Sequence, residues 1–416
     1  MYLTYGAHER ELEAAAAITL GLETAAAQGF SVNLRSIGDN IKTTICEFVD
    51  KNAGVGVASI GMGKGIGRQS MASAIFEAHE HLFSIGKVSS CGLKLLKLDI
   101  NGRDSLLIES CPDLHSIIGN HPSLFSRTEY TEFNNSSEIL DYPYFLTNPY
   151  FEPVDKLEVK VLKSFSLRRY STNSGTASGT NKSEALLHGL LEVVERDSIG
   201  IALLATILKK EPIPVKKYKY DLLTPNLQLL FNNVKVETGG DLHVWDISSE
   251  IGLPTALAAL TVGGMQGSRY FGSGASLSPS YAIERAVLES VQYYQLHLLN
   301  GKVKPRSGAQ MQTNLPTYVQ CFLEAGFFGY RGGTVLANHA KIWDAESDAT
   351  QTPDKQLSLI VGKLKACGFK SYWRSLSDGP VVVMQVVVPR LERFHLVARG
   401  VPVAPGPRGR SILGSV

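Results

Sequence analysis

Residues 174–197 read SGTASGTNKSEALLHGLLEVVERD, and this stretch says most about the fold. Residues 173–180 are too poor in large side chains to pack a core, so we expect a loop there. Asn181, with Glu184 three positions later, matches a capping box and predicts that a helix begins here. The helix then carries an apolar face at helical spacing, formed by Leu187, Leu190, Leu191 and Val194.

Acidic residues recur one helical turn apart in this chain, at Glu77 with Glu80, at Glu192 with Glu195, and at Glu289, one turn after Arg285. Carboxylates at this spacing share a helix face and repel each other by roughly 0.2–0.5 kcal/mol. Their neighbours are apolar, where a carboxylate is costly unless it is paired or bound to a metal. Mg²⁺ takes oxygen ligands and accompanies phosphates, so it is the candidate ligand. The alternative is a set of solvated helix faces.

Two further features could bind phosphate. Arg196 and Arg285 suit phosphate ligation, although each could instead form an intrahelical salt bridge. Gly61–Gly67 is predicted as a loop between a strand at residues 55–60 and a helix at residues 69–84. It matches neither a Walker A loop nor a dinucleotide fingerprint, so a tight structural turn and a phosphate site both remain open.

Composition narrows the class of protein. The chain has 416 residues, 44% of them hydrophobic, and a formal net charge of +2, which gives no reason to expect a nucleic-acid or membrane partner. No signal peptide or membrane-spanning run is evident. Five scattered cysteines disfavour a disulfide framework and a zinc site, and no H-E-x-x-H or G-x-S-x-G motif occurs. We expect a cytoplasmic protein.

The expected helices and strands are intermixed along the chain, which predicts an α+β fold with mixed β-sheets and packed helices. Helices are expected at residues 9–28 and 279–299, and strands at 157–162, 242–247, 255–262 and 381–388. Residues 101–150 are expected to form loops and short elements. We divide the chain into an N-terminal helix with lead-in strands, residues 1–54, and a catalytic domain, residues 55–416.

Several blocks occur in an order typical of one known family. They are Gly63-Lys64-Gly65, then Ser73 with Glu77 and Glu80, then residues 174–185, Glu192-x-x-Glu195-Arg196-Asp197, Arg285 with Glu289 and Gln292, and Val386-Val387-Val388-Pro389-x-Leu391-Glu392. Together they resemble the YcaO family over roughly residue 55 to the end of the chain. Residues 174–197 are the most specific part.

The resemblance implies a fold without a P-loop that binds ATP and Mg²⁺ between acidic helices. By correspondence of motifs, the implied Mg²⁺ ligands are Glu77, Glu80, Glu192, Glu195 and Glu289. The implied nucleotide contacts are Lys64, Ser73, Glu184, Arg196 and Arg285. Glu192, Glu195 and Arg285 are the implied catalytic residues.

The family resemblance also implies a reaction. ATP phosphorylates the oxygen of a backbone amide in a ribosomally made peptide, and a nucleophile then displaces phosphate. A neighbouring Cys, Ser or Thr gives an azoline by cyclodehydration, which is the leading interpretation. Thioamide or amidine formation by the same ATP chemistry is the alternative. A YcaO-like scaffold or maturation factor without catalysis is the alternative from another class.

The resemblance also implies partners for this protein, and the sequence departs from the family pattern at several positions. We expect a precursor peptide as substrate, a separate leader-peptide-binding protein, and a homodimer. His81 stands where an arginine is common, and Tyr293 where small or basic residues are commoner. The proline-rich residues 402–407 differ from the alternating prolines that end many azoline-forming members. This last departure weakens the azoline interpretation.

Overall fold

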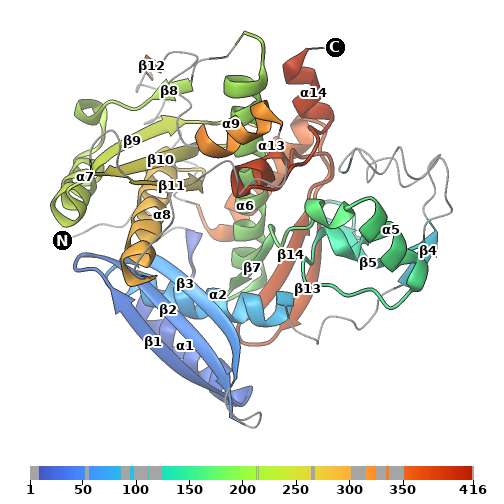
Figure 1. Cartoon of the computed structure of the whole chain (residues 1–416). Coiled ribbons are helices and arrows are strands. Elements are labelled where there is room, and N and C mark those ends of the chain that lie inside the picture. Colours follow the sequence, from blue (N-terminus) through green and yellow to red (C-terminus); the bar gives the residue numbers. More distant parts are fainter. Residues whose placement is uncertain are drawn as a thin grey trace.

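The fold was analysed in a computed structural model (Figure 1). The structure describes residues 9–51, 56–85, 94–97, 111, 124–211, 213, 215–263, 268–300, 315–324, 334–336 and 351–414. Of the region at 101–150 that was expected to form loops and short elements, residues 101–110 and 112–123 lie outside the described residues. No helix in the described ranges is long and apolar enough to span a membrane.

The N-terminal layer is an antiparallel sheet with two helices on one face (Figure 1). Its strands, in the order β1-β2-β3, are Phe30–Ile37, Ile41–Asp50 and Val57–Ile66, and its helices are α1 (Ala14–Ala27) and α2 (Gln69–Ile85). The core between them includes Phe48, Ala74 and Ile75. The helix expected at residues 9–28 is thus confirmed in its main part.

Residues 61–66, with three of the four glycines, belong to a strand, which corrects the expected loop. Gly61 and Gly63 lie in the middle of β3, directly against α2. A Cβ atom at Gly61 would lie 2.1 Å from the carbonyl oxygen of Ala74, and one at Gly63 would lie 2.0 Å from that of Ser70. These glycines therefore let the strand and helix backbones approach closely, and the phosphate-loop interpretation is wrong for this segment.

A second sheet runs in the order β11-β10-β9-β8-β12, antiparallel except for the parallel β8–β12 pair. In chain order these strands are β8 (Val215–Lys217), β9 (Asp241–Asp246), β10 (Thr255–Val262), β11 (Ser268–Ala275) and β12 (Thr334–Leu336). Helix α8 (Pro279–Asn300) packs on β10 and β11, and α7 (Pro225–Thr238) contacts β9. Gly272 and Gly274 allow α8 the same close approach, because a Cβ at Gly272 would lie 2.1 Å from the Ala286 carbonyl oxygen.

The third sheet has the order β4-β5-β13-β14-β7, with β6 paired to β5. Its strands are β4 (Lys94–Lys97), β5 (Leu124–Glu132), β6 (Ile139–Pro143), β7 (Thr176–Gly179), β13 (Tyr372–Asp378) and β14 (Val382–Val387). Helix α6 (Lys182–Leu203) packs on β14 and β7. The shorter helices α5 (Lys156–Ser164), α9 (Pro316–Glu324), α13 (Pro353–Ala366) and α14 (Pro407–Leu413) complete the fold.

Two local expectations in this region are wrong. Residues 157–162 lie in α5 and not in a strand, because the Asp155 side chain accepts hydrogen bonds from the backbone N–H groups of Leu157 and Glu158 and begins a helix. Residues 176–179 form strand β7 within the expected loop, paired with β14. The predicted start of α6 is confirmed, since Asn181 accepts from the backbone N–H of Glu184 at 2.9 Å.

Candidate functional site

A cavity of about 930 Å³ is lined mainly by α2, α6, α8 and residues 10–17, with Met62 and Lys64 from β3. Every candidate site residue from the sequence lines it, namely Lys64, Ser73, Glu77, Glu80, Glu184, Glu192, Glu195, Arg196, Arg285 and Glu289. The three acidic helices belong to three different layers of the fold, so their convergence is a property of the tertiary structure. A cavity of this size is typical of a small-molecule site, and its many charged side chains suit a charged ligand.

Helix α2 contributes the two least compensated carboxylates. Glu77 accepts a hydrogen bond from the backbone N–H of Met62 at 3.2 Å and lies 3.9 Å from His81 Nε2. Burial raises the pKa of Glu77, and His81 and Lys64 oppose this effect. Burial, and then the charges of Glu192 and Glu77, raise the pKa of Glu80 well above its ordinary value. The α2 side of the cavity therefore carries negative charge that the protein neutralises poorly.

Helices α6 and α8 hold their carboxylates with cations and a serine. Arg196 Nη1 lies 3.3 Å from Glu195 Oε1, and Arg196 Nε lies 3.7 Å from Glu192 Oε1. Lys64 Nζ lies 3.2 Å from Glu289 Oε2. Burial raises the pKa of Glu289, but the charges of Lys64 and Arg196 outweigh it and the net shift is downward. Ser273 links the helices, since its hydroxyl donates to Glu195 at 2.6 Å and its backbone N–H to Glu289 at 3.0 Å.

The donor set fits a hard cation, although the side chains do not form a closed metal cage. Within the described part of the chain, no group of three or more His, Cys, Asp or Glu side chains could hold a metal ion as placed. The five candidate Mg²⁺ ligands nevertheless line one cavity, and Glu80 forms no ion pair with a described residue. Oxygen ligands with residual negative charge are what Mg²⁺ prefers.

The N-terminal segment supplies partners for two of the candidate nucleotide contacts. Arg10 Nη1 donates to Glu184 Oε1 at 2.8 Å, and Arg285 Nη1 lies 3.5 Å from Glu9 Oε2. Glu184 also accepts from the backbone N–H of Thr180 at 3.1 Å, which fixes it at the start of α6. Both candidate contacts are therefore engaged within the protein.

Several titratable residues that line the cavity were not expected from the sequence, namely Arg10, Glu11, Glu13, His188, Tyr281 and Arg399. Burial, and then the charges of Arg10 and Arg285, lower the pKa of His188 well below its ordinary value, so this imidazole is neutral. His188 lies one turn before Glu192 on α6, and that spacing could have indicated it. Arg10 and Arg399 come from segments without any local motif, so only the tertiary structure reveals them.

Similar proteins place the chain among known ones. An uncharacterized protein from Methanothermobacter thermautotrophicus is 26% identical over 398 residues, which cover 91% of each chain. A YcaO protein from Methanopyrus kandleri, solved with AMPPCP and Mg²⁺, has a TM-score of 0.66 at 18% identity, covering 95% of this chain and 96% of that one.

A heterocyclase solved in complex with substrate and cofactor has a TM-score of 0.67 at 17% identity and covers 92% of this chain. The match covers 53% of the heterocyclase, so this chain spans about half its length. At these identities the structures show a shared fold, which confirms the expected α+β architecture. The family model that matches residues 62–392 describes YcaO cyclodehydratases that bind ATP and Mg²⁺, which confirms these two cofactors at the level of the family. Because that match covers most of its length, the chain belongs to the YcaO family.

Proposed function

We propose that this protein uses ATP and Mg²⁺ to phosphorylate the oxygen of a backbone amide in a ribosomally made peptide, and that it forms an azoline by cyclodehydration. The observation that carries the proposal is that the five candidate Mg²⁺ ligands line one cavity together with Lys64, Arg196 and Arg285. Carboxylates for a divalent cation and cations for phosphate are the two charge sets that phosphoryl transfer requires.

The proposed roles follow from the charges and positions. Glu77, Glu80, Glu192, Glu195 and Glu289 would hold Mg²⁺, which neutralises phosphate charge when bound. Lys64, Arg196 and Arg285 would bind phosphate oxygens, with Ser73 and Glu184 as further nucleotide contacts. Glu192, Glu195 and Arg285 are proposed as the catalytic residues. Side chains of all these residues line the same cavity.

The ion pairs at the cavity suggest how the protein accepts its ligands. Lys64 is paired with Glu289, Arg196 with Glu195, and Arg285 with Glu9. When phosphate binds, Lys64 and Arg196 would move from carboxylate to phosphate oxygens and leave Glu289 and Glu195 to Mg²⁺. The exchange conserves the number of charge pairs, so it limits the desolvation cost of filling the site.

The chemistry of the substrate explains why ATP is needed. An amide oxygen is a poor leaving group, and transfer of a phosphoryl group converts it to a good one. The arginines and Lys64 would position the phosphates and balance charge as it shifts toward the amide oxygen. Attack by a neighbouring Cys, Ser or Thr side chain at the carbonyl carbon would then expel phosphate and leave an azoline.

The expected partners belong to the proposal. The substrate is a precursor peptide, bound with the help of a separate leader-peptide-binding protein, and the chain acts as a homodimer. The family resemblance supports these expectations. Size-exclusion chromatography with light scattering would measure the oligomeric state directly.

An isotope experiment tests the proposed reaction. Synthetic X–Cys peptides with ¹⁸O in the amide carbonyl are incubated with protein, ATP and Mg²⁺, and the released phosphate is analysed by mass spectrometry. Amide activation transfers the label to phosphate, and the Glu192→Gln, Glu195→Gln double variant does not. The peptide product separates the outcomes, since an azoline has lost water whereas a thioamide has exchanged oxygen for sulfur. Release of unlabelled phosphate contradicts the proposal.

A further inference from the structure

Arg399 reaches the cavity from the C-terminal part of the chain. It ends the 3₁₀ turn Phe394–Arg399, which follows β14 and contacts α6. The charge of Arg196, and then burial, lower the pKa of Arg399, while Tyr293, Glu192 and Glu289 act in the opposite direction. Arg399 therefore lines the same cavity as Arg196, Glu192 and Glu289 and is influenced by their charges.

Within the described part of the chain, Arg399 differs from the other cationic side chains of the cavity in forming no ion pair. Arg10, Lys64, Arg196 and Arg285 each lie within 4.0 Å of a glutamate oxygen. Among the described residues, the guanidinium of Arg399 forms no ion pair and no hydrogen bond. A guanidinium held beside another arginine, without a carboxylate of its own, favours binding of an anion.

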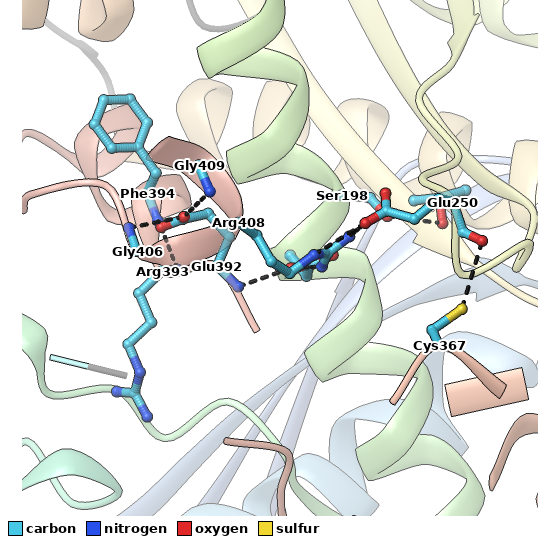
Figure 2. Close-up of polar contacts among 11 residues, drawn as sticks. Ser198, Glu250, Cys367, Glu392, Arg393, Phe394, Gly406, Arg408 and Gly409 are labelled. Atoms are coloured by element: carbon cyan, nitrogen blue, oxygen red, sulfur yellow. Dashed lines mark hydrogen bonds and ion pairs between the residues drawn. The ribbon is translucent and has the colours of Figure 1, made fainter. Parts of the chain in front are cut away.

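Arg399 lies in the loop formed by residues 393–409, and both ends of this loop donate hydrogen bonds to the carboxylate of Glu392. Glu392, which is 3% exposed, accepts hydrogen bonds from the backbone N–H groups of Arg393 at 2.9 Å and Phe394 at 3.1 Å. It also accepts from Gly406 at 2.9 Å and Gly409 at 3.0 Å, so both ends of the segment meet at the same side chain (Figure 2). The charged acceptor makes these hydrogen bonds stronger than neutral ones.

Residues at both ends of this loop also contact α6, the helix that bears Glu192 and Glu195. Asp197, a fully buried residue of α6, accepts from the backbone N–H of Glu392 at 2.7 Å and from Arg408 of α14. Arg408 in turn pairs with Glu250 (Figure 2). The proline-rich residues 402–407 are not among the residues that line the cavity. The part of this loop that reaches the cavity is thus Arg399.

We propose that Arg399 binds the nucleotide phosphates beyond the α-phosphate, together with Arg196, and that Glu392 positions it by closing the loop. The inference rests on the proposed function, because it assumes that the cavity binds ATP. Arg399 is preorganised by the loop, so little ordering is needed when the anion arrives.

Isothermal titration calorimetry with Mg²⁺ tests the inference, using AMPPCP and AMP as ligands. Arg399→Gln should weaken AMPPCP binding about tenfold or more, the expected effect of losing a charge-assisted hydrogen bond. AMP binding should stay within about twofold of wild type by the same reasoning. Arg35→Gln, which removes an exposed arginine from β1, is the matched control and should bind both ligands normally.

Glu392→Gln tests the positioning role without removing a charge that lines the cavity. It should reproduce the selective loss of AMPPCP affinity, with AMP affinity retained as evidence that the site is folded. If Arg399→Gln binds AMPPCP as tightly as wild type, or loses AMP equally, Arg399 does not bind the outer phosphates and the inference is wrong. If wild type binds neither nucleotide, the proposed function itself fails, and the inference fails with it.

Discussion

At the level of single residues, the surroundings of Glu80 indicate which kind of ligand the site binds. Its carboxylate lies near Glu77 and Glu192, and no described residue forms an ion pair with it. A protein that needed only a stable fold would gain by an uncharged side chain here, because an uncompensated charge in a partly buried position destabilises the folded state. The position therefore favours a role in binding a cation.

The pH dependence of stability should report this carboxylate. Because the pKa of Glu80 is raised in the folded protein, the folded state holds the proton more tightly than the unfolded state. The contribution of Glu80 to the free energy of unfolding should therefore fall as pH rises from about 4.5 toward neutrality, so the slope of stability against pH should be more negative in wild type than in Glu80→Gln. Thermal melts of the ligand-free protein across this range measure the slopes.

Glu23→Gln serves as the control for that experiment. Glu23 is an exposed glutamate of α1, outside the cavity lining, so its variant should keep the wild-type slope. Equal slopes for wild type and Glu80→Gln would show that Glu80 is not under the electrostatic stress described above.

At the level of elements, glycine-containing strands allow the acidic helices to approach their sheets. Gly61 and Gly63 of β3 lie against α2, and Gly272 and Gly274 of β11 lie against α8. The close approach fixes Glu77 and Glu289 relative to the strands, as seen in the backbone hydrogen bonds from Met62 and Ser273. The glycines thus help to set the position of the carboxylates.

Gly63→Ala should disturb this arrangement. The new Cβ would lie 2.0 Å from the Ser70 carbonyl oxygen, so α2 must shift. We expect a loss of about 1–3 kcal/mol in the free energy of unfolding, the usual range for overpacking. Urea denaturation measures it, and Gly56→Ala, where no atom lies within 4 Å of the added Cβ, should stay close to wild type. A wild-type value for Gly63→Ala would contradict the close packing.

The same elements show what the sequence could and could not predict. The beginning of α6 was predictable because Asn181 and Glu184 form a local cap. Residues 157–162 alternate like a strand, but the cap at Asp155 makes them helical. The glycines of β3 resembled a loop because sequence alone does not show a helix packed against them. Local capping signals were therefore reliable, whereas small-residue segments depended on tertiary packing.

Across the whole molecule, the cavity joins segments from both ends of the chain. Arg10 near the N-terminus and Arg399 near the C-terminus line the same cavity as α2, α6 and α8. The acidic residues could be predicted because each helix repeats one spacing. Arg10 and Arg399 could not, since their proximity depends on long-range contacts that have no sequence period.

The C-terminal attachment to α6 should contribute strongly to global stability. Arg408→Ala leaves the buried carboxylate of Asp197 without its cation, which typically costs about 3–5 kcal/mol. Equilibrium urea denaturation measures the loss. Arg410→Ala, in the same helix, removes a side chain whose hydrogen bond is to the Pro405 carbonyl oxygen, and it should change stability little. Equal stability of the two variants would show that the Asp197–Arg408 pair does not hold the C-terminal segment.

The central claim is that the acidic helices together bind ATP with Mg²⁺, and calorimetric titration of the purified chain tests it most directly. Wild type should bind ATP in the presence of Mg²⁺ and should bind it much more weakly when EDTA removes the metal. The Glu192→Gln, Glu195→Gln double variant should lose the part of the ATP affinity that depends on Mg²⁺. ATP binding that is equally strong with EDTA, or unchanged in the double variant, would show that the acidic helices do not bind ATP through Mg²⁺.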